Sequence, residues 1–406
     1  MHRLLLMYTM DPRGAKVGGI ETHIRQILRH HPEDFSVLFV GTDERGDCEI
    51  GKVQRLSLGG RSFDFLPVAR IEPEAVNRAA KRLTQSTTLR YVLGALRHLG
   101  AIRRALGPGP ATADLHRFEF APLARLLGLP AIQMIHGEGS KKDRMDSLIK
   151  TYWYIHSSGE RLALRLARGI YCVNPAIVER LKAEFPHAYP KAELLSVSVD
   201  TGLFRPTPFD CADDTLRIVF AGRLDEFKDP PLLFRTVAEL RRRLGRVELH
   251  YIGATDPERY AEFAAIQDVT VRHGFQDAEG VARIMARCHA GILTSFFEGM
   301  PCYLLEGLAA GRPFGAIRLP QYDPLVVRGV SGALVERQEA PEASAQALAS
   351  GFVEIWEGIK AGRINPARVA AMVEPYAITN QMSRLFARHR ALRSGGRAGA
   401  PKVVAA

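Results

Sequence analysis

The sequence predicts an α/β protein with two domains, each built on a parallel sheet flanked by helices. Short apolar runs that suit buried parallel strands alternate along the chain with segments of helical period, and they do so in two blocks. The predicted strands include residues 4–8, 35–40, 216–221, 247–253 and 290–293. A chain of 406 residues with 46% hydrophobic content is long enough for two ordinary domains.

The composition limits the kinds of partner and of cellular compartment that the protein can have. The net charge of +11 fits an anionic partner: nucleotide phosphates, an acidic membrane surface or a nucleic acid. A nucleic acid has only this charge in its favour, because no aromatic and basic reading surface is evident. The five cysteines are odd in number and include no C-x-x-C pair, which argues against a disulfide framework or a zinc knuckle and indicates a reducing cytoplasm. No apolar run reaches the ~18 residues of a membrane span, so we expect a soluble or peripheral protein.

The most informative stretch follows the predicted strand at residues 290–293. A short loop carries Glu298, and Pro301 suits the first position of a helix that Gly311 would end. The N–H groups and dipole at such a helix start can hold phosphate. Glu306 lies eight positions after Glu298, and ionised carboxylates accept sugar hydroxyls. The combination indicates a nucleotide-sugar site; the alternative is that both glutamates are solvated surface residues.

Two further loops are candidates for phosphate binding. Gly18 and Gly19 stand between the first strand and a helix, where glycine lets a ligand approach the backbone, although a plain tight turn explains them equally well. Arg223 and Lys228 lie in the loop after the strand at residues 216–221. A guanidinium and an ammonium there would neutralise the charge that grows on a leaving diphosphate. The alternative is a pair of solvated loop cations.

Histidines and aromatic residues offer contacts to a sugar or an acceptor. His136 ends one predicted strand and His116 ends the strand before it, the edge of a sheet where ligands bind. Either histidine alone would more often be structural. Tyr152, Trp153 and Tyr154 could stack on a sugar or lie at a lipid interface, and otherwise belong to the core.

Residues 74–106 have a helical and basic pattern. Their apolar stripe consists of Leu89, Val92, Leu93, Leu96 and Leu99, and their polar side of Arg78, Lys81, Arg82, Arg90, Arg97, Arg103 and Arg104. A basic amphipathic helix over residues 78–104 could lie on an anionic membrane. The alternative, which is the more common arrangement, is a leucine stripe that faces the core and a basic face in solvent.

Several of these segments resemble one family. Residues 298–313 resemble the signature E-G-x-P-x-x-x-L-E-A-x-A-x-G-x-P of the retaining GT-B glycosyltransferases of family four, with Gly307 in place of the first alanine. Residues 222–229 resemble its G-R-L-x-x-x-K-G motif, with Asp229 in place of the last glycine. Residues 199–206 resemble the V-D-x-x-x-F-x-P segment that closes the first domain of that family, although Ser196-Val197-Ser198 replaces the usual Asn-Gly.

The resemblance implies a role for each matching residue. Glu298 would contact the donor sugar, Glu306 the ribose and His136 the transferred sugar, with Arg223 and Lys228 on the diphosphate. The glycine loop would approach the pyrophosphate, and further donor contacts would come from Gly299, Met300, Gly274 and Phe275. His116, Tyr152 and Trp153 are weaker candidates on the acceptor side.

The fold that the resemblance implies is GT-B, two Rossmann-like domains that face a central cleft. The expected acceptor-side domain is residues 1–204 and the nucleotide-sugar domain residues 205–376. A helix at residues 377–393 would cross back onto the first domain, and the glycine-rich tail at residues 394–406 is predicted to be disordered.

The expected reaction is a metal-independent transfer of a hexosyl unit with retained configuration, in bacterial envelope polysaccharide synthesis. The sequence contains no D-x-D, the motif that supplies metal ligands in GT-A enzymes, so protein cations would meet the diphosphate. The donor would be a UDP- or GDP-sugar and the acceptor a glycan or a lipid-linked molecule. The alternatives are a nucleotide-sugar 2-epimerase and a non-catalytic protein that binds a nucleotide sugar or a membrane surface.

Overall fold

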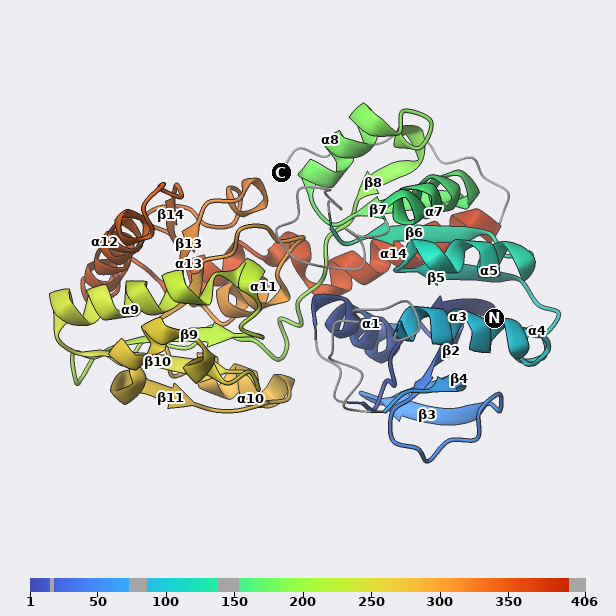
Figure 1. Ribbon diagram of the computed structural model, residues 1–406, viewed down its shortest axis with the longest axis horizontal. Helices are drawn as coiled ribbons and strands as arrows, with labels where there is room; N and C mark the ends of the chain where they lie inside the picture. The colour runs from blue at the N-terminus through green and yellow to red at the C-terminus, as the bar shows by residue number, and fades with distance from the viewer. Residues whose placement is uncertain (15–17, 73–85, 138–152, 394–406) are drawn as a thin grey trace. The chain divides into compact units, whose positions relative to one another are not determined.

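The computed structural model describes residues 1–14, 18–72, 86–137 and 153–393 (Figure 1). The chain divides into two compact units. The first comprises Met1–Val197 with the chain from Thr379 onward, and the second comprises Ser198–Ile378. The predicted tail at residues 394–406 lies outside the described residues.

The first unit contains an eight-stranded sheet. Its strands are β1 (His2–Met7), β2 (Phe35–Asp43), β3 (Gln54–Leu58), β4 (Arg61–Arg70), β5 (Ala111–Leu115), β6 (Ala131–Ile135), β7 (Gly169–Cys172) and β8 (Ala192–Leu194). They run in the order β3-β4-β2-β1-β5-β6-β7-β8, and every neighbouring pair is parallel except β3 with β4. The helices are α1 (Gly19–His30), α3 (Thr87–Arg97), α4 (Leu99–Leu106), α5 (Ala121–Leu126), α7 (Trp153–Leu166), α8 (Pro175–Glu184) and α14 (Ile378–Arg393).

The second unit contains a six-stranded sheet in which every neighbouring pair is parallel. Its strands are β9 (Leu216–Ala221), β10 (Val247–Ile252), β11 (Thr270–Arg272), β12 (Ala290–Leu293), β13 (Phe314–Ile317) and β14 (Gly332–Val335), in the order β11-β10-β9-β12-β13-β14. The helices are α9 (Pro230–Leu244), α10 (Ala278–Met285), α11 (Cys302–Ala309), α12 (Pro341–Lys360) and α13 (Pro366–Ala371).

The strand order creates one special position in each sheet. In the second unit, β10 and β11 lie on one side of β9, and the chain then returns to place β12 on the other side. In the first unit, the same reversal occurs between β1 and β5. The loops after two such neighbouring strands diverge and leave a crevice, which is where α/β sheets bind ligands. The predicted site loops follow these strands in both units.

Helix α14 returns to the first unit after the second is complete. Its Arg390 forms an ion pair with Asp34 at 2.8 Å, and its Phe386 packs on Phe35 at 4.7 Å between ring centroids. His389 is fully buried and lies 2.9 Å from the hydroxyl of Thr112 in β5. These contacts attach α14 to β5 and to the start of β2.

For three of its five residues, the structure contradicts the alternative in which the apolar stripe of residues 74–106 faces the core. Leu89, Leu93 and Leu96 are 42%, 58% and 43% exposed, whereas the buried residues of α3 are Tyr91 and Ala95. The reason is close packing on β4, because a Cβ atom at Gly94 would overlap the backbone carbonyl of Val68. The described part of this segment is also two helices, α3 and α4, and residues 73–85 lie outside the described residues.

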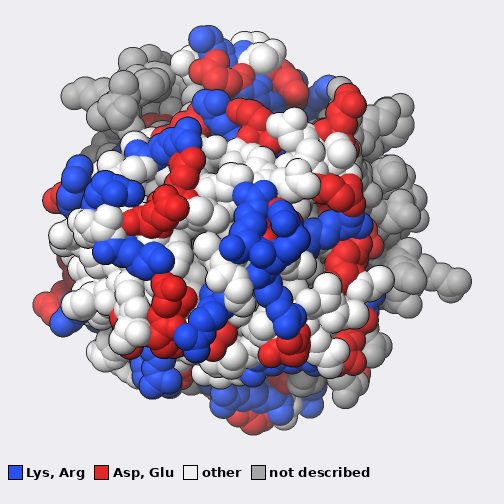
Figure 2. All heavy atoms as spheres, turned by 90° about the vertical axis from the view of Figure 1, so that its left-hand side faces the viewer, with Lys and Arg blue, Asp and Glu red and all other residues white. Residues whose placement is uncertain are grey.

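The charged side chains of the surface are mixed in sign. On the face that Figure 2 shows, basic side chains lie beside acidic ones. Pairs such as Arg241 with Asp268, at 2.7 Å, illustrate how cations of the second unit are matched by carboxylates. Among the helices that the structure describes, none combines the length and apolar character needed to cross a membrane.

Candidate functional site

The crevice of the second unit brings Lys228 and Glu298 together. Lys228 ends a short 3₁₀ turn after β9, and Glu298 lies in the loop after β12. The Nζ of Lys228 donates a hydrogen bond of 2.9 Å to Oε1 of Glu298, and the hydroxyl of Ser295 donates one of the same length to that oxygen. The two charged side chains are only 16% and 12% exposed. An ammonium ion and a carboxylate therefore share a partly buried position at the carboxyl ends of two neighbouring strands.

Backbone contacts fasten these two loops to each other. The hydroxyl of Thr294 donates to the carbonyl of Lys228 at 2.6 Å, and the N–H of Phe296 donates to the carbonyl of Phe227 at 2.8 Å. The rings of Phe227 and Phe297 stack at 5.2 Å. The separation of Lys228 and Glu298 is thus set by both loops and not by the ion pair alone.

Asp229, the residue after Lys228 in the chain, forms an ion pair with Arg337. Asp229 has a left-handed backbone (φ 52°, ψ 62°), and its side chain caps α9 by accepting from the N–H of Leu232 at 3.3 Å. Arg337 donates to Asp229 at 2.6 Å and to the carbonyl of Thr294 at 2.5 Å. The sequence marked Asp229 only as a departure from a glycine motif and did not identify Arg337, which lies in another part of the chain.

Glu306 lies in α11, the helix that follows the Glu298 loop. Burial raises the pKa of its carboxyl to about 7, and no described side chain donates a hydrogen bond to it. The helix begins at Cys302, with Pro301 as the residue before it, and Gly311 has a φ of 80° just past its end. Pro301 therefore precedes the helix that it was expected to start, while Gly311 is placed as predicted. Pro301, the residue at the N-cap position of α11, makes no side-chain hydrogen bond to the helix start.

The other predicted donor residues of this unit line the same sheet edge more loosely. Arg223 pairs with Asp225 at 3.0 Å, and its side chain is 52% exposed, so it is not part of the Lys228 pair. Met300 is buried and Gly299 is partly exposed in the Glu298 loop. Gly274 has a φ of 65° in the turn after β11, and Phe275 beside it is exposed.

The crevice of the first unit holds the predicted glycines and histidines. Gly18 precedes α1 with an extended backbone (φ 178°), and Gly19 is the first residue of the helix. His116 follows β5, His136 follows β6, and their ring nitrogens Nδ1 and Nε2 lie 2.8 Å apart. Tyr152 lies outside the described residues, and only the backbone of Trp153, at the start of α7, is described.

A third histidine, His23 of α1, completes the group and was not identified from the sequence. Its ring centroid lies 5.6 Å from that of His116 and 6.0 Å from that of His136. His23 is fully buried, which lowers its pKa to about 3. Burial also lowers the pKa of His136 well below its usual value, so these rings are neutral at pH 7. In the sequence, the only sign of His23 was its position on the face of a predicted helix that packs on the sheet.

One group of described residues has the ligand spacing of a metal site. Oxygen and sulfur atoms of Asp43, Asp47 and Cys48 lie within 4.8 Å of one another in the first unit. Arg13 pairs with Asp47 at 2.8 Å and Arg70 with Asp43 at 3.0 Å, so both carboxylates already face a guanidinium. Burial raises the pKa of the Cys48 thiol to about 11, which keeps it protonated at pH 7. These features fit an ion-pair cluster better than a cation site.

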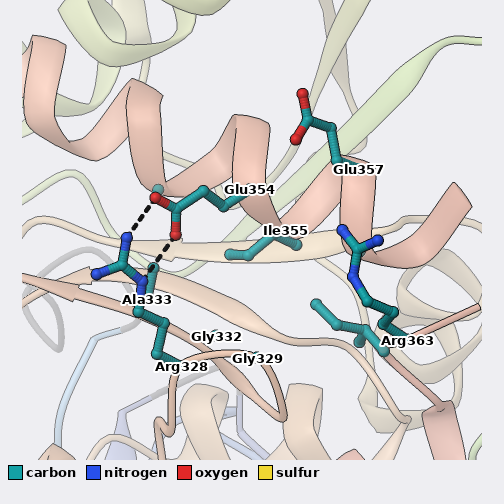
Figure 3. A pocket seen from close by; sticks show the side chains of 11 residues that line it. Arg328, Gly329, Gly332, Ala333, Glu354, Ile355, Glu357 and Arg363 are labelled. Atoms are coloured by element: carbon teal, nitrogen blue, oxygen red, sulfur yellow. Dashed lines mark hydrogen bonds and ion pairs between the residues drawn. The ribbon is translucent and has the colours of Figure 1, made fainter. Parts of the chain in front are cut away.

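A pocket in the second unit lies away from the predicted residues. It is lined by residues of α12 and of the loops around β14, among them Arg328, Glu354 and Arg363 (Figure 3). Arg328 is engaged in a two-point ion pair with Glu354. None of the predicted donor residues lines it, so the crevice beside β9 and β12 remains the candidate site.

Comparison with known proteins gives this site a family context. Residues 215–351 match the glycosyl transferases group 1 family. A D-inositol 3-phosphate glycosyltransferase from Arthrobacter sp. (strain FB24) is 25% identical over 236 residues, and the match spans 54% of this chain and 56% of that relative. The chain therefore aligns with little more than half the length of this curated relative.

Solved structures resemble the chain over almost its full length. Sucrose-phosphate synthase from Thermosynechococcus elongatus has a TM-score of 0.77 at 16% identity and covers 98% of this chain and 100% of its own. HepE from Anabaena, solved in complex with UDP, has a TM-score of 0.65 at 14% identity and covers 96% and 99%. Residues 215–351, which include Lys228, Glu298 and Glu306, thus match a glycosyl transferases group 1 domain within a chain that has the GT-B fold.

Proposed function

We propose that the protein is a retaining, metal-independent glycosyltransferase that moves a hexosyl unit from a UDP- or GDP-sugar to a glycan or lipid-linked acceptor. The observation that carries the proposal is the partly buried pair of Lys228 and Glu298 in the crevice of the glycosyl transferases group 1 domain. A cation there can meet the diphosphate, and carboxylates beside it can accept sugar hydroxyls. The UDP complex of the similar HepE structure supports a nucleotide sugar as the donor.

The proposed roles of these residues follow from the negative charge that develops on the diphosphate during transfer. The bond between the sugar C1 and the diphosphate oxygen breaks, the acceptor oxygen forms a new bond to C1, and the acceptor proton passes to the leaving phosphate. Negative charge grows on the diphosphate as its bond breaks, and Lys228 would stabilise it, with Arg223 near the same strand end. The N-terminus of α11 adds a positive dipole. Glu306 in its ionised form can accept the two ribose hydroxyls.

The test is donor hydrolysis by the purified protein over a panel of UDP- and GDP-sugars, with and without a chelator. We expect one donor to be hydrolysed slowly, at the same rate in the chelator. Lys228→Met should lower this rate about 100-fold, the usual effect of removing one group that stabilises developing charge. The matched control is Lys360→Met. Lys360 lies at the end of α12 and is also paired with a carboxylate, that of Asp214, at 3.0 Å. Equal rates for both variants would refute the role of Lys228.

The same assay separates the rival functions. A 2-epimerase would convert the donor to its epimer without releasing the nucleotide or needing an acceptor. A non-catalytic binding protein would retain the donor unchanged. Transfer to an acceptor, with an unchanged anomeric configuration in the proton NMR spectrum of the product, is the result that the proposal requires.

A lipid-linked acceptor is favoured by the outward face of α3. Leu89, Leu93 and Leu96 are exposed along one helix, and Arg90 and Arg97 are exposed beside them. Leucines that enter the lipid boundary beside arginines that meet anionic headgroups are typical of helices that lie on a membrane. We therefore place this face on the inner surface of the cell membrane, where a polysaccharide precursor would be presented.

Vesicle sedimentation tests this membrane contact. Binding to phosphatidylglycerol vesicles should exceed binding to phosphatidylcholine vesicles and should fall at least about fivefold in Leu93→Glu. Leu162→Glu replaces another exposed leucine of the same unit, on α7, and should bind like the wild type. Equal losses in the two variants, or no preference for the anionic lipid, would contradict the contact.

A further inference from the structure

A row of polar side chains runs through the interior of the first unit. It joins β1, β5 and α14 to the ends of β5 and β6 through His2, Thr112, His389, Asp114, His116 and His136. All of these side chains are buried except that of His136, which is partly exposed. The row thus ends at His136, the histidine to which the family resemblance assigns contact with the transferred sugar.

The negative charge in the row is that of Asp114. Its side chain is 0% exposed. Its two oxygens face two different rings, with Oδ1 3.8 Å from Nε2 of His116 and Oδ2 3.8 Å from Nε2 of His389. Both distances exceed hydrogen-bond length, so the carboxylate acts on the two rings through its charge. Burial alone would raise the pKa of Asp114, but these facing rings hold it below its usual value. Asp114 is therefore an ionised carboxylate between two imidazoles.

Each imidazole is engaged through its other nitrogen. Nδ1 of His116 lies 2.8 Å from Nε2 of His136. Nδ1 of His389 lies 2.9 Å from the hydroxyl of Thr112, and that hydroxyl lies 2.8 Å from Nε2 of His2. A neutral imidazole has one N–H and one acceptor nitrogen, so the position of one proton determines what the other nitrogen can do.

We propose that Asp114 is a positioning residue that sets the tautomer of His136 through His116. The charge of a buried carboxylate favours an N–H over a lone pair on each ring nitrogen that faces it, so His116 and His389 carry their protons on Nε2. Nδ1 of His116 is then an acceptor, and His136 must donate to it from Nε2. His136 is left with an unprotonated Nδ1. Asp114 also orients the opposite arm, where Thr112 donates to His389.

The consequence for function rests on the proposed glycosyl transfer. An acceptor nitrogen at His136 suits a hydroxyl group of a sugar and does not suit a phosphate or carboxylate. Burial lowers the pKa values of His116 and His136, which favours the neutral form of both rings. The tautomer itself does not depend on whether the chain transfers sugar, so it can be tested separately.

The test is two-bond ¹⁵N–¹H NMR correlation on protein labelled at histidine, in which the two neutral tautomers give different patterns. His116→Gln and His136→Gln each remove one set of signals and so assign them. The proposal predicts the Nε2–H tautomer for both rings in the wild type. The Nδ1–H tautomer for either ring would overturn it, and this result needs no variant of Asp114.

Two variants test the cause. Asp114→Asn keeps the shape but replaces one acceptor oxygen with an NH₂ donor, so His116 or His389 must change its proton position and the single pattern should be lost. Thr112→Val is the matched control, because it breaks only the arm toward His2 and should leave His116 and His136 as in the wild type. Unchanged tautomers at all three rings, His116, His136 and His389, in a folded Asp114→Asn protein would refute the positioning role even if glycosyl transfer were confirmed.

Discussion

The ammonium of Lys228 lies 2.9 Å from Oε1 of Glu298, so the cation that should meet a diphosphate is paired with a carboxylate when no donor is bound. A diphosphate must compete with Glu298 for this cation. Glu298→Gln should therefore strengthen the binding of free UDP or GDP about three- to tenfold, while it lowers donor hydrolysis. Isothermal titration calorimetry and the hydrolysis assay measure the two effects separately.

The comparison variant for this prediction is Glu306→Gln. Glu306 lies in α11 and has no cation paired with it among the described residues. Its replacement should therefore weaken nucleotide binding. Opposite signs for the two glutamine variants are expected. If Glu298→Gln weakened the binding of UDP as Glu306→Gln does, the competition between carboxylate and diphosphate would be wrong.

Nucleotide binding should depend on pH through Glu306. Burial raises the pKa of this carboxyl to about 7, and only its ionised form accepts two hydroxyls. Affinity for a UDP-sugar should therefore rise about tenfold from pH 6 to pH 8 and level off above that range. Calorimetry with the sugar nucleotide measures this, because its diphosphate does not titrate there. The Glu306→Gln protein should show a flat profile, and a rise in both proteins would exclude Glu306 as the titrating group.

The effects of replacing Asp229 and Arg337 on the free energy of unfolding should depend on each other. Arg337→Leu leaves the carboxylate of Asp229, whose side chain is only 14% exposed, without its cation and should cost about 1–3 kcal/mol. Asp229→Gly should cost less, because glycine adopts the left-handed backbone at φ 52° without strain. A double-mutant cycle of urea unfolding should give a coupling of about 1 kcal/mol or more. Additive effects within about 0.5 kcal/mol would show that the pair does not fasten the Lys228 loop.

Acid should destabilise the first unit through His23. Its pKa is about 3 in the folded protein and about 6.5 in the unfolded chain, so only the unfolded chain takes up the proton between these values. The free energy of unfolding should therefore have its full value above about pH 6.5. It should fall as the pH decreases, by about 2 kcal/mol at pH 5 from this group alone. In His23→Leu the loss between pH 7.5 and pH 5 should be smaller by that amount. Parallel curves for the two proteins would contradict the assignment.

The parallel strands could be predicted from the sequence because their burial makes them apolar runs. Strand β9 covers the predicted residues 216–221 and β12 the predicted residues 290–293. Both strands lie between two neighbouring strands, and Arg217 of β9 is the single polar residue in them. Loops with glycine, proline or charge mark their ends. Lys228 and Glu298 could be selected for the same reason, since each follows one of these strands.

The remaining features depend on contacts that no local pattern records. The leucines of α3 point outward because Gly94 and Ala95 allow the helix to pack closely on β4, and small residues carry little weight in a hydrophobic pattern. Arg337 and Asp229 are 108 positions apart, and Thr112 and His389 are 277 positions apart. Such partners are identified only when the fold brings them together, so Arg337, Asp114 and His389 were not site candidates from the sequence.

The most direct test of the account is a crystal structure of the protein soaked with the UDP- or GDP-sugar that it hydrolyses. The central claim is that the crevice beside β9 and β12 holds the sugar nucleotide through Lys228. We predict a diphosphate oxygen within about 3 Å of Nζ of Lys228 and ribose hydroxyls on Glu306. A nucleotide bound elsewhere, for example in the pocket beside Arg328 and Arg363, would contradict it.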